Sequence, residues 1–271
     1  MTLATAETAD RTLPGVPPAA KSISVIVTAM NEEGNLKPTV DSVVRAVAPR
    51  FLTYEIIVVD DGSQDRTFEI AEALSAENPR IRVHRNPRNL GLGRSYGIGI
   101  ALARHEHTSW VAGNNIVSQE ALERVYDRAG ERDMVISYVL RDVRGFRRRM
   151  MSRAFTRSMN LLFGARMRYY TGPCVYKSDV AKRFRMRAQG SMFVAELLLR
   201  LLKSGQSYVE VGLQPLPRSS GSTKTFRLRN LTDVFGSVIR LFWELRVRGT
   251  LGLARQPDVS VTPNDPVVRS R

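Results

Sequence analysis

Short apolar segments alternate with helical patterns between residues 22 and 139, and this alternation restricts the possible folds more than any other feature. The expected strands are Ser22–Ala29, Tyr54–Val59, Ile81–Arg85, Thr108–Ala112 and Met134–Val139. Apolar residues recur at helical spacing between them, and the expected helices are Leu36–Val47, Asp65–Ala76, Gly93–Ala103 and Gln119–Ala129. Strands that are apolar on both faces and are joined by helices form a mostly parallel sheet with helices on both sides. The sequence therefore predicts an α/β domain.

Polar side chains follow three of the expected strands at the points where those strands end. The segments are Asn31–Glu33 after the first strand, Asp60–Ser63 after the second and Gly113–Asn115 after the fourth. In open α/β sheets, ligands bind beyond the carboxyl ends of the parallel strands. These three segments are therefore the first candidates for a binding site.

The composition is that of an ordinary globular protein and excludes several classes. Of the 271 residues, 43% are hydrophobic and 25% are charged, which rules out a disordered or collagen-like chain. The single cysteine, Cys174, excludes an internal disulfide and a multi-cysteine zinc site. No apolar run approaches the roughly 18 residues that cross a bilayer, and the N-terminal residues do not resemble a secretory signal.

Positive charge is concentrated in the C-terminal half of the chain. The formal net charge is +15, yet residues 21–140 contain 14 basic and 16 acidic residues. Residues 141–187 contain 14 basic residues and only two acidic ones. This asymmetry points to an anionic partner, which is a nucleic acid, an anionic membrane surface or a phosphorylated substrate.

Composition and periodicity also divide the chain into segments. Residues 1–21 and 256–271 show no periodicity and are expected to be flexible tails. The folded domain is expected over residues 22–230, in two halves that meet after residue 112. Residues 231–255 are expected to form a separate basic amphipathic helix.

Four stretches of the sequence resemble glycosyltransferase family 2, whose members have the GT-A nucleotide-sugar fold. The stretches are SVIVTAMNEEGNL (24–36), EIIVVDDGSQDRT (55–67), NPRNLGLGRSYGIGIALA (86–103) and GSMFVAELLLRLLKSGQSYVEVGLQPLPRSSGSTK (190–224). The second is the most specific. The chain most resembles the branch that contains the dolichol-phosphate mannose synthases and other polyprenyl-phosphate sugar transferases. The resemblance implies a Rossmann-like domain with a nucleotide-binding half (22–112) and an acceptor half (113–230).

The resemblance implies a nucleotide-sugar site at the strand ends. Its candidate residues are Ala29, Asn31, Glu32, Asp60, Asp61, Gly113, Asn114 and Asn115. A carboxylate at the end of a buried strand accepts hydrogen bonds from a nucleobase imide and a ribose hydroxyl, and Asp60 is expected to do so with Glu32 facing it. The alternative is that Asp60 and Asp61 only cap the following helix and shape a turn.

The family's metal motif is absent from this sequence. Relatives place an Asp-x-Asp after the fourth strand, where it holds Mg²⁺ or Mn²⁺ against the donor diphosphate, whereas this chain has Gly113–Asn115. Magnesium and manganese prefer charged oxygen ligands. Three alternatives follow: a metal held more weakly by Asn115, the diphosphate and water; arginines in place of the metal; or loss of catalysis.

Basic residues are expected to bind the acceptor. Arg148 and Ser152 match a family segment that meets the lipid phosphate, and Arg218, Ser222 and Lys224 belong to the closing loop. Arg148 and Arg218 are expected to act in catalysis by orienting and neutralising phosphates. A hydroxyl acceptor would also need a base. Glu196 is the candidate, and the alternative is that Glu196 only pairs with Arg200 one helical turn later.

Two amphipathic helices carry basic residues and aromatic residues. They are expected at Arg147–Leu162 and Leu231–Leu245. Such helices either lie in the headgroup layer of an anionic membrane or pack on the sheet with solvated arginines. The chain is thus expected to be cytoplasmic and peripheral on the cytosolic face of a membrane, directly or through a membrane partner protein.

The predicted function is transfer of a sugar from a UDP- or GDP-linked donor to a polyprenyl phosphate or another membrane-associated acceptor, either a lipid phosphate or a glycan. The resemblance implies that the transfer inverts the anomeric carbon. The alternative is a catalytically silent GT-A scaffold subunit of a membrane glycan complex, which the missing acidic motif favours. A nucleic-acid partner is not expected, because the sequence contains no recognisable RNA- or DNA-binding motif.

Overall fold

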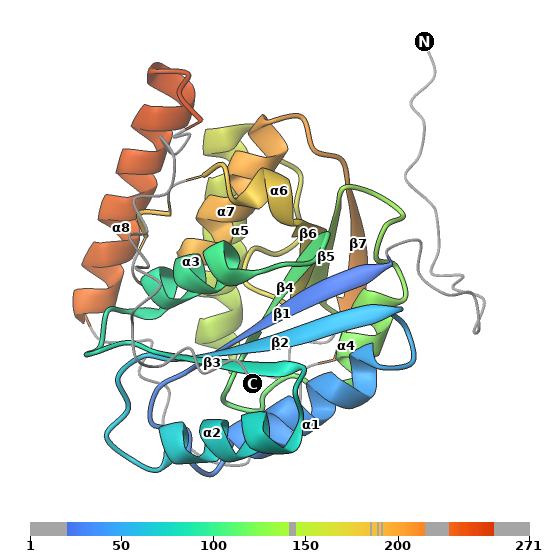
Figure 1. The fold of residues 1–271 in the computed structure, drawn as a ribbon. Coiled ribbons are helices and arrows are strands. Elements are labelled where there is room, and N and C mark those ends of the chain that lie inside the picture. Colours follow the sequence, from blue (N-terminus) through green and yellow to red (C-terminus); the bar gives the residue numbers. More distant parts are fainter. Residues whose placement is uncertain are drawn as a thin grey trace.

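The computed structural model describes residues 21–140, 145–184, 186–188, 190, 192–214 and 228–251. Within these residues, seven strands form one sheet in the order β3-β2-β1-β4-β6-β5-β7 (Figure 1). The strands are β1 Ser22–Ala29, β2 Thr53–Asp60, β3 Ile81–Arg85, β4 His107–Ala112, β5 Met134–Val139, β6 Cys174–Lys177 and β7 Tyr208–Leu213. The helices are α1 Leu36–Val47, α2 Thr67–Glu77, α3 Leu92–Leu102, α4 Gln119–Tyr126, α5 Phe146–Phe163, α6 Ser178–Ala181, α7 Phe193–Lys203, α8 Leu228–Phe242 and the π-helical turn η2 Trp243–Val247.

The first four strands are parallel, and β1 and β2 are almost wholly buried, as their continuous apolar sequences predict. The sheet is mixed beyond them, because β6 runs antiparallel between β4 and β5. Strand β6 has four residues and was not predicted from the sequence. The mostly parallel α/β architecture is confirmed.

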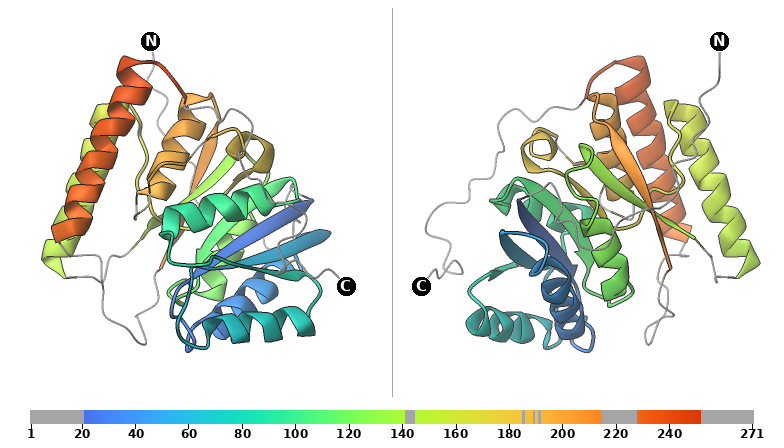
Figure 2. Two further views of the ribbon diagram at one scale, coloured as in Figure 1. Left: turned by 60° about the vertical axis from the view of Figure 1, so that its left-hand side comes forward. Right: turned by 90° about the vertical axis from the view of Figure 1, so that its right-hand side faces the viewer.

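Helices cover both faces of the sheet and create two hydrophobic clusters. Helices α1, α2 and α4 lie on one face, and α3, α5, α7 and α8 lie on the other (Figures 1 and 2). Tyr96, Trp110 and Phe193 stack edge to face in the second cluster. This packing fixes the ends of β1, β2 and β4 relative to α3 and α7.

Helices α5 and α8 lie side by side along one margin of the molecule (Figure 2). The rings of Phe163 and Phe242 are 6.2 Å apart, and Arg246 Nε donates a 3.0 Å hydrogen bond to the Leu162 carbonyl. The helix that was predicted over 231–255 starts at Leu228 and ends with η2 at Val247. No helix of the described residues is long and apolar enough to cross a membrane.

We expect His107, at the start of β4, to make the fold less stable in acid. The side chain is 3% exposed, and neither ring nitrogen has a hydrogen-bond partner among the described residues. Burial lowers the pKa of His107 below its ordinary value of 6.5. The unfolded chain therefore takes up a proton before the folded chain does, and the free energy of unfolding should fall as the pH drops below 6.5.

Urea unfolding at pH 8 and pH 5.5 measures this effect. We expect His107→Gln to lose less stability over that interval than the wild type. His84→Gln, in the edge strand β3, is the matched control and should keep the wild-type difference. Equal pH dependence in His107→Gln and the wild type would contradict the assignment.

Candidate functional site

The carboxyl ends of β1, β2 and β4 gather three predicted binding segments at one edge of the sheet. Ala29 pairs with Asp60 in the parallel register, and the Asp61 N–H donates a 2.9 Å hydrogen bond to the Ala29 carbonyl. The Gly113 N–H donates a 2.9 Å bond to the Thr28 carbonyl. The sequence correctly predicts that Asn31, Asp60 and Gly113 follow adjacent strand ends.

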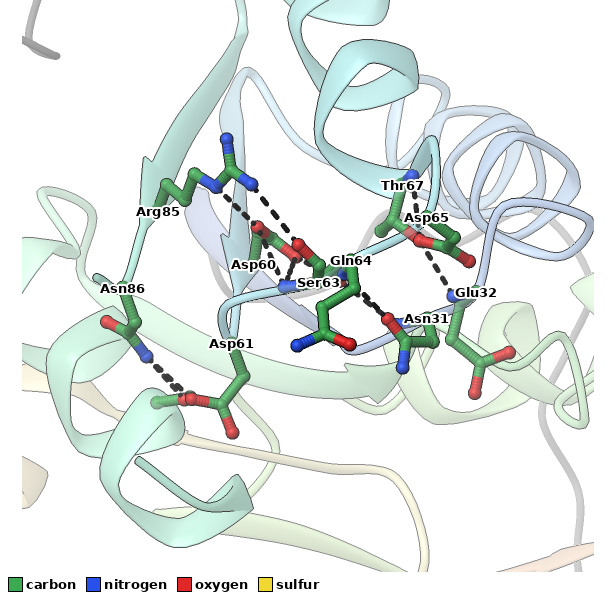
Figure 3. Close-up of polar contacts among 11 residues, drawn as sticks. Asn31, Glu32, Asp60, Asp61, Ser63, Gln64, Asp65, Thr67, Arg85 and Asn86 are labelled. Carbon is green, nitrogen blue, oxygen red and sulfur yellow. Dashed lines mark hydrogen bonds and ion pairs between the residues drawn. The ribbon is translucent and has the colours of Figure 1, made fainter. Parts of the chain in front are cut away.

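Asp60 lies at the centre of this edge and is fully buried (Figure 3). Its carboxylate accepts hydrogen bonds from the Ser63 hydroxyl and, at 3.2 Å, from the Ser63 N–H. Arg85 Nε lies 3.3 Å from the same carboxylate. Burial raises the pKa of Asp60 above its ordinary value, although Ser63 and Arg85 favour the ionised form. The contacts with Ser63 are those of the turn-shaping alternative, and a contact between Asp60 and a nucleotide stays a prediction.

Asn31 and Glu32 tie the first strand end to the segment after β2. The Asn31 N–H donates to the Ser63 hydroxyl at 3.0 Å, and Asn31 Oδ1 accepts from the Gln64 N–H at 2.9 Å. Asn31 has a φ of 54°, a left-handed conformation that asparagine tolerates better than most residues. The Glu32 carboxylate accepts a 2.8 Å bond from the Asn35 side chain and points away from Asp60, where the sequence predicts that it faces Asp60 (Figure 3).

Asp61 holds the glycine-rich segment that precedes α3. Its carboxylate accepts hydrogen bonds from Asn86 Nδ2 at 2.9 Å, the Leu90 N–H at 2.8 Å and the Gly91 N–H at 3.0 Å. The side chain is 4% exposed. These contacts make Asp61 a support for the segment, and its contact with a nucleotide stays a prediction.

Gly93 in α3 lies against the backbone of Ala188. A Cβ atom at Gly93 would lie 1.8 Å from the Ala188 carbonyl oxygen. A Cβ at Gly97, one turn later, would be 3.9 Å from its nearest neighbour, the Met186 Cβ. Only glycine therefore fits at position 93, whereas position 97 accepts alanine.

Two alanine variants of α3 test this packing. We expect Gly93→Ala to lower the free energy of unfolding by about 1–3 kcal/mol, because the backbones of α3 and the 186–188 segment must separate. Gly97→Ala should raise it by up to about 1 kcal/mol, because alanine favours the helix. Thermal and urea unfolding measure both. Equal stability of the two variants would show that the close approach at Gly93 is wrong.

Gly113–Asn115 follows β4, where the sequence resemblance predicts a metal motif. Asn114 Oδ1 is buried and has no hydrogen-bond partner among the described residues. Asn115 has a φ of 51°. The described residues contain no group of three or more His, Cys, Asp or Glu side chains that would bind a metal by themselves. An unpaired amide oxygen is a hard neutral ligand, so the segment fits one ligand position of a divalent cation that the donor diphosphate also binds. The sequence predicts Asn115 as that ligand, whereas the unpaired oxygen belongs to Asn114.

Glu196 belongs to a buried network of ion pairs. The side chain is 3% exposed, and Arg200 is fully buried beside it, with Arg200 Nη2 at 2.7 Å from Glu196 Oε1. The N–H of Ala188 donates to Glu196 Oε2 at 2.7 Å. Arg200 also lies 2.7 Å from Glu244 of η2 and donates a 2.7 Å bond to the Leu251 carbonyl. The pairing alternative for Glu196 is thus observed, and a role as base, which would require these contacts to break, stays a prediction.

The acceptor candidates are only partly described. Arg148 and Ser152 lie in α5 and are both half-buried. Arg218, Ser222 and Lys224 lie outside the described residues.

Arg85 and Asn86 are site residues that sequence reasoning missed. Arg85 pairs in register with Asp60 across β2 and β3, and its guanidinium lies 4.3 Å from the Phe68 ring centroid. Asn86 links Asp61 to Ser95, to which its amide donates at 2.8 Å. Their position in the sequence could have indicated them, because Arg85 and Asn86 lie at the end of β3, which pairs with β2, and β2 ends in Asp60.

Comparison with known proteins gives a consistent result. Residues 24–188 match the family model for glycosyl transferase family 2. Glycosyltransferase AglD of Haloferax volcanii is 26% identical over 242 residues, which are 85% of this chain and 38% of that protein. A dolichyl-phosphate beta-glucosyltransferase of Mus musculus is 34% identical over 93 residues, which are 32% of this chain and 29% of the relative. The chain thus spans less than two thirds of the length of both relatives.

Solved structures share the fold. Glucosyl-3-phosphoglycerate synthase from Mycobacterium tuberculosis, crystallised with Mn²⁺, UDP and phosphoglyceric acid, superposes with a TM-score of 0.61 at 20% identity. The match covers 82% of this chain and 78% of that one. The predicted GT-A fold is confirmed.

Proposed function

The chain belongs to glycosyl transferase family 2, and on this premise we propose that it transfers a sugar from a UDP- or GDP-linked donor to a polyprenyl phosphate, with inversion at the anomeric carbon. The observation that carries the proposal is the buried Asp60 at the carboxyl end of β2, tied to Asn31 through Ser63. That edge is where α/β sheets bind their ligands.

Asp60 recognises the nucleoside in this proposal. In its ionised form, the carboxylate accepts a hydrogen bond from a nucleobase imide or a ribose hydroxyl. Arg85 and the Ser63 N–H support that form and fix its position. Asp61 keeps Leu90 and Gly91 in place at the start of α3. Asn31, through its left-handed backbone, brings the end of β1 against Ser63 in the loop after β2.

Asn114 and Asn115 face the donor diphosphate in this proposal. They would hold Mg²⁺ or Mn²⁺ together with diphosphate oxygens, and the ion would neutralise the charge that develops on the leaving diphosphate. Two neutral amides bind a cation more weakly than two carboxylates, so metal dependence should be weaker than in relatives with Asp-x-Asp. Arginines of the basic segment are the alternative source of that neutralisation.

The acceptor in this proposal is an anion that needs no general base. A phosphate oxygen of the lipid attacks the anomeric carbon, the bond between that carbon and the donor's β-phosphate oxygen breaks, and the nucleoside diphosphate leaves with its electron pair. Arg148 and Ser152, with Arg218, Ser222 and Lys224, orient and neutralise the phosphate. Arg200 and the Ala188 N–H already engage the Glu196 carboxylate, which would be the base for a hydroxyl acceptor. This favours a phosphate acceptor over a hydroxyl. Relatives named as dolichyl-phosphate glucosyltransferases agree with it.

Transfer assays test the proposal directly. Purified protein is incubated with UDP-glucose, UDP-galactose or GDP-mannose and a short polyprenyl phosphate, and the glycolipid is detected by mass spectrometry. We expect one donor to give a β-linked product from an α-linked sugar nucleotide. Asp60→Asn should reduce its formation. Retention of the donor's anomeric configuration would contradict the proposed inversion.

A catalytically silent scaffold is the second candidate, and the missing carboxylates at Gly113–Asn115 favour it. A scaffold has no need to bind nucleotide tightly. Nucleotide binding without transfer to any acceptor would leave this candidate in place, whereas transfer would remove it. In either case, we propose that the protein works at the cytosolic face of a membrane.

A further inference from the structure

An exposed apolar stripe runs along the outer face of α8 and η2. Its members are Phe235, Ile239, Trp243 and Val247, which are 68%, 54%, 53% and 51% exposed. They recur every four residues and therefore lie along one side of the helix. On the opposite side of the same helix, Leu241 and Leu245 are buried in the hydrophobic core. Exposed stripes of large apolar side chains mark interaction surfaces.

Arginines flank the apolar stripe, and no exposed acid accompanies them in residues 234–251. The exposed charges are Arg240, Arg246 and Arg248. The acid of this segment, Glu244, is buried against Arg187 and Arg200. The exposed surface of the segment is therefore both apolar and positively charged.

Helix α5, which lies beside α8, has the same character (Figure 2). Its sequence contains no acid, and Phe146, Met150 and Leu161 are exposed by 67%, 56% and 82%. Arg153 and Arg157 are exposed on the same helix. The two helices thus form an outer layer in which every exposed charged side chain that the structure describes is an arginine.

We propose that the apolar stripe of α8 and η2 docks on the surface of an anionic lipid bilayer. Trp243, Phe235 and Ile239 enter the headgroup layer, and the flanking arginines meet lipid phosphates. The purpose of the docking rests on the proposed function, since the lipid acceptor would be reached there.

Other occupants fit the surface less well. A two-fold dimer through the stripe would place Arg240, Arg246 and Arg248 of both copies close together. Like charges at such a contact repel each other. A nucleic acid would use the arginines and the aromatic rings, but Ile239 and Val247 offer no face on which a base stacks.

Vesicle co-sedimentation with the full chain tests the proposal. The vesicles are pure phosphatidylcholine, or phosphatidylcholine and phosphatidylglycerol at 3:1. We expect binding to the anionic vesicles, weakened in 0.5 M NaCl, and a blue shift of tryptophan emission that Trp243→Phe removes. The double variant Phe235→Ser, Trp243→Ser should bind anionic vesicles at least about tenfold more weakly than the wild type. Leu52→Ser is the matched control, because Leu52 is 78% exposed in the α1–β2 connection, and it should bind as the wild type does.

Three results would overturn the docking proposal: no binding to anionic vesicles, equal binding by the double variant, or a dimer in sedimentation that the double variant dissociates. Circular dichroism and thermal unfolding verify that each variant is folded. Titration with UDP and GDP separates the two proposals. A wild type that binds nucleotide but no vesicle contradicts the docking alone, and one that binds vesicles but no nucleotide contradicts the proposed function alone.

Discussion

Replacing Arg200 by methionine is expected to lower the free energy of unfolding by about 3–5 kcal/mol. The guanidinium is fully buried and joins Glu196 of α7, Glu244 of η2 and the Leu251 carbonyl. Without it, Glu196 is left as a buried carboxylate with backbone donors but no cation. Because Glu196 also holds the Ala188 N–H, the loss should spread to the segment that packs on Gly93. Urea unfolding measures the change.

The exposed pair Lys37–Asp41 provides the matched control for Arg200. It is also an i, i+4 pair, with N···O at 3.1 Å, but its side chains are 59% and 36% exposed. Lys37→Met should therefore cost about 0.5 kcal/mol or less. A loss below about 1 kcal/mol in Arg200→Met would mean that the buried network does not anchor η2.

Replacing Asp60 by asparagine is expected to weaken nucleotide binding by about 10- to 100-fold, the usual value of a hydrogen bond to a charged group. The fold should tolerate the change, because burial already raises the pKa of Asp60 and so disfavours its charge. Isothermal titration with UDP and GDP measures the affinity, and thermal unfolding verifies the fold. Asp41→Asn, on exposed α1, is the control and should bind as the wild type does. Unchanged affinity in Asp60→Asn would assign Asp60 to turn formation alone.

The raised pKa of Asp60 also predicts how nucleotide binding depends on pH. The ionised carboxylate is the acceptor, and it gains a proton at a higher pH than an ordinary aspartate does. Affinity should therefore begin to fall, on acidification, above the ordinary pKa of 3.8. Asp60→Asn should lack this dependence.

The strands and the donor-side helices could be predicted from the sequence because their signal is local. The predicted bounds of β1, β3 and β5 match the structure. Strands β1 and β5 are mainly apolar segments, whereas β3 alternates apolar and basic residues. Strand β6 has four residues, and its antiparallel pairing with β4 and β5 depends on contacts far apart in the chain. The end of α8 was also missed: after Phe242 the chain continues as the π-helical turn η2, whose Glu244 pairs with Arg200.

The candidate site shows the same division. The positions of Asn31, Asp60 and Gly113 follow from the ends of adjacent strands. The partners of their side chains do not follow, because Arg85 and Asp60 are 25 positions apart and meet only through strand register. Likewise, the sequence left open whether Glu196 is a base or pairs with Arg200. The structure shows that Arg200 and the Ala188 N–H both donate to the Glu196 carboxylate, while Arg200 also bonds to Glu244 of η2.

Isothermal titration of the purified chain with UDP, GDP and their sugar conjugates tests the central claim most directly. Each titration is run with Mn²⁺, with Mg²⁺ and with EDTA. We expect specific binding of one nucleotide. EDTA should weaken that binding if the amide oxygens of Gly113–Asn115 help to hold a metal, and should leave it unchanged if arginines replace the metal. A folded sample that binds no nucleotide under any of the three conditions would contradict the claim that this chain is a glycosyltransferase.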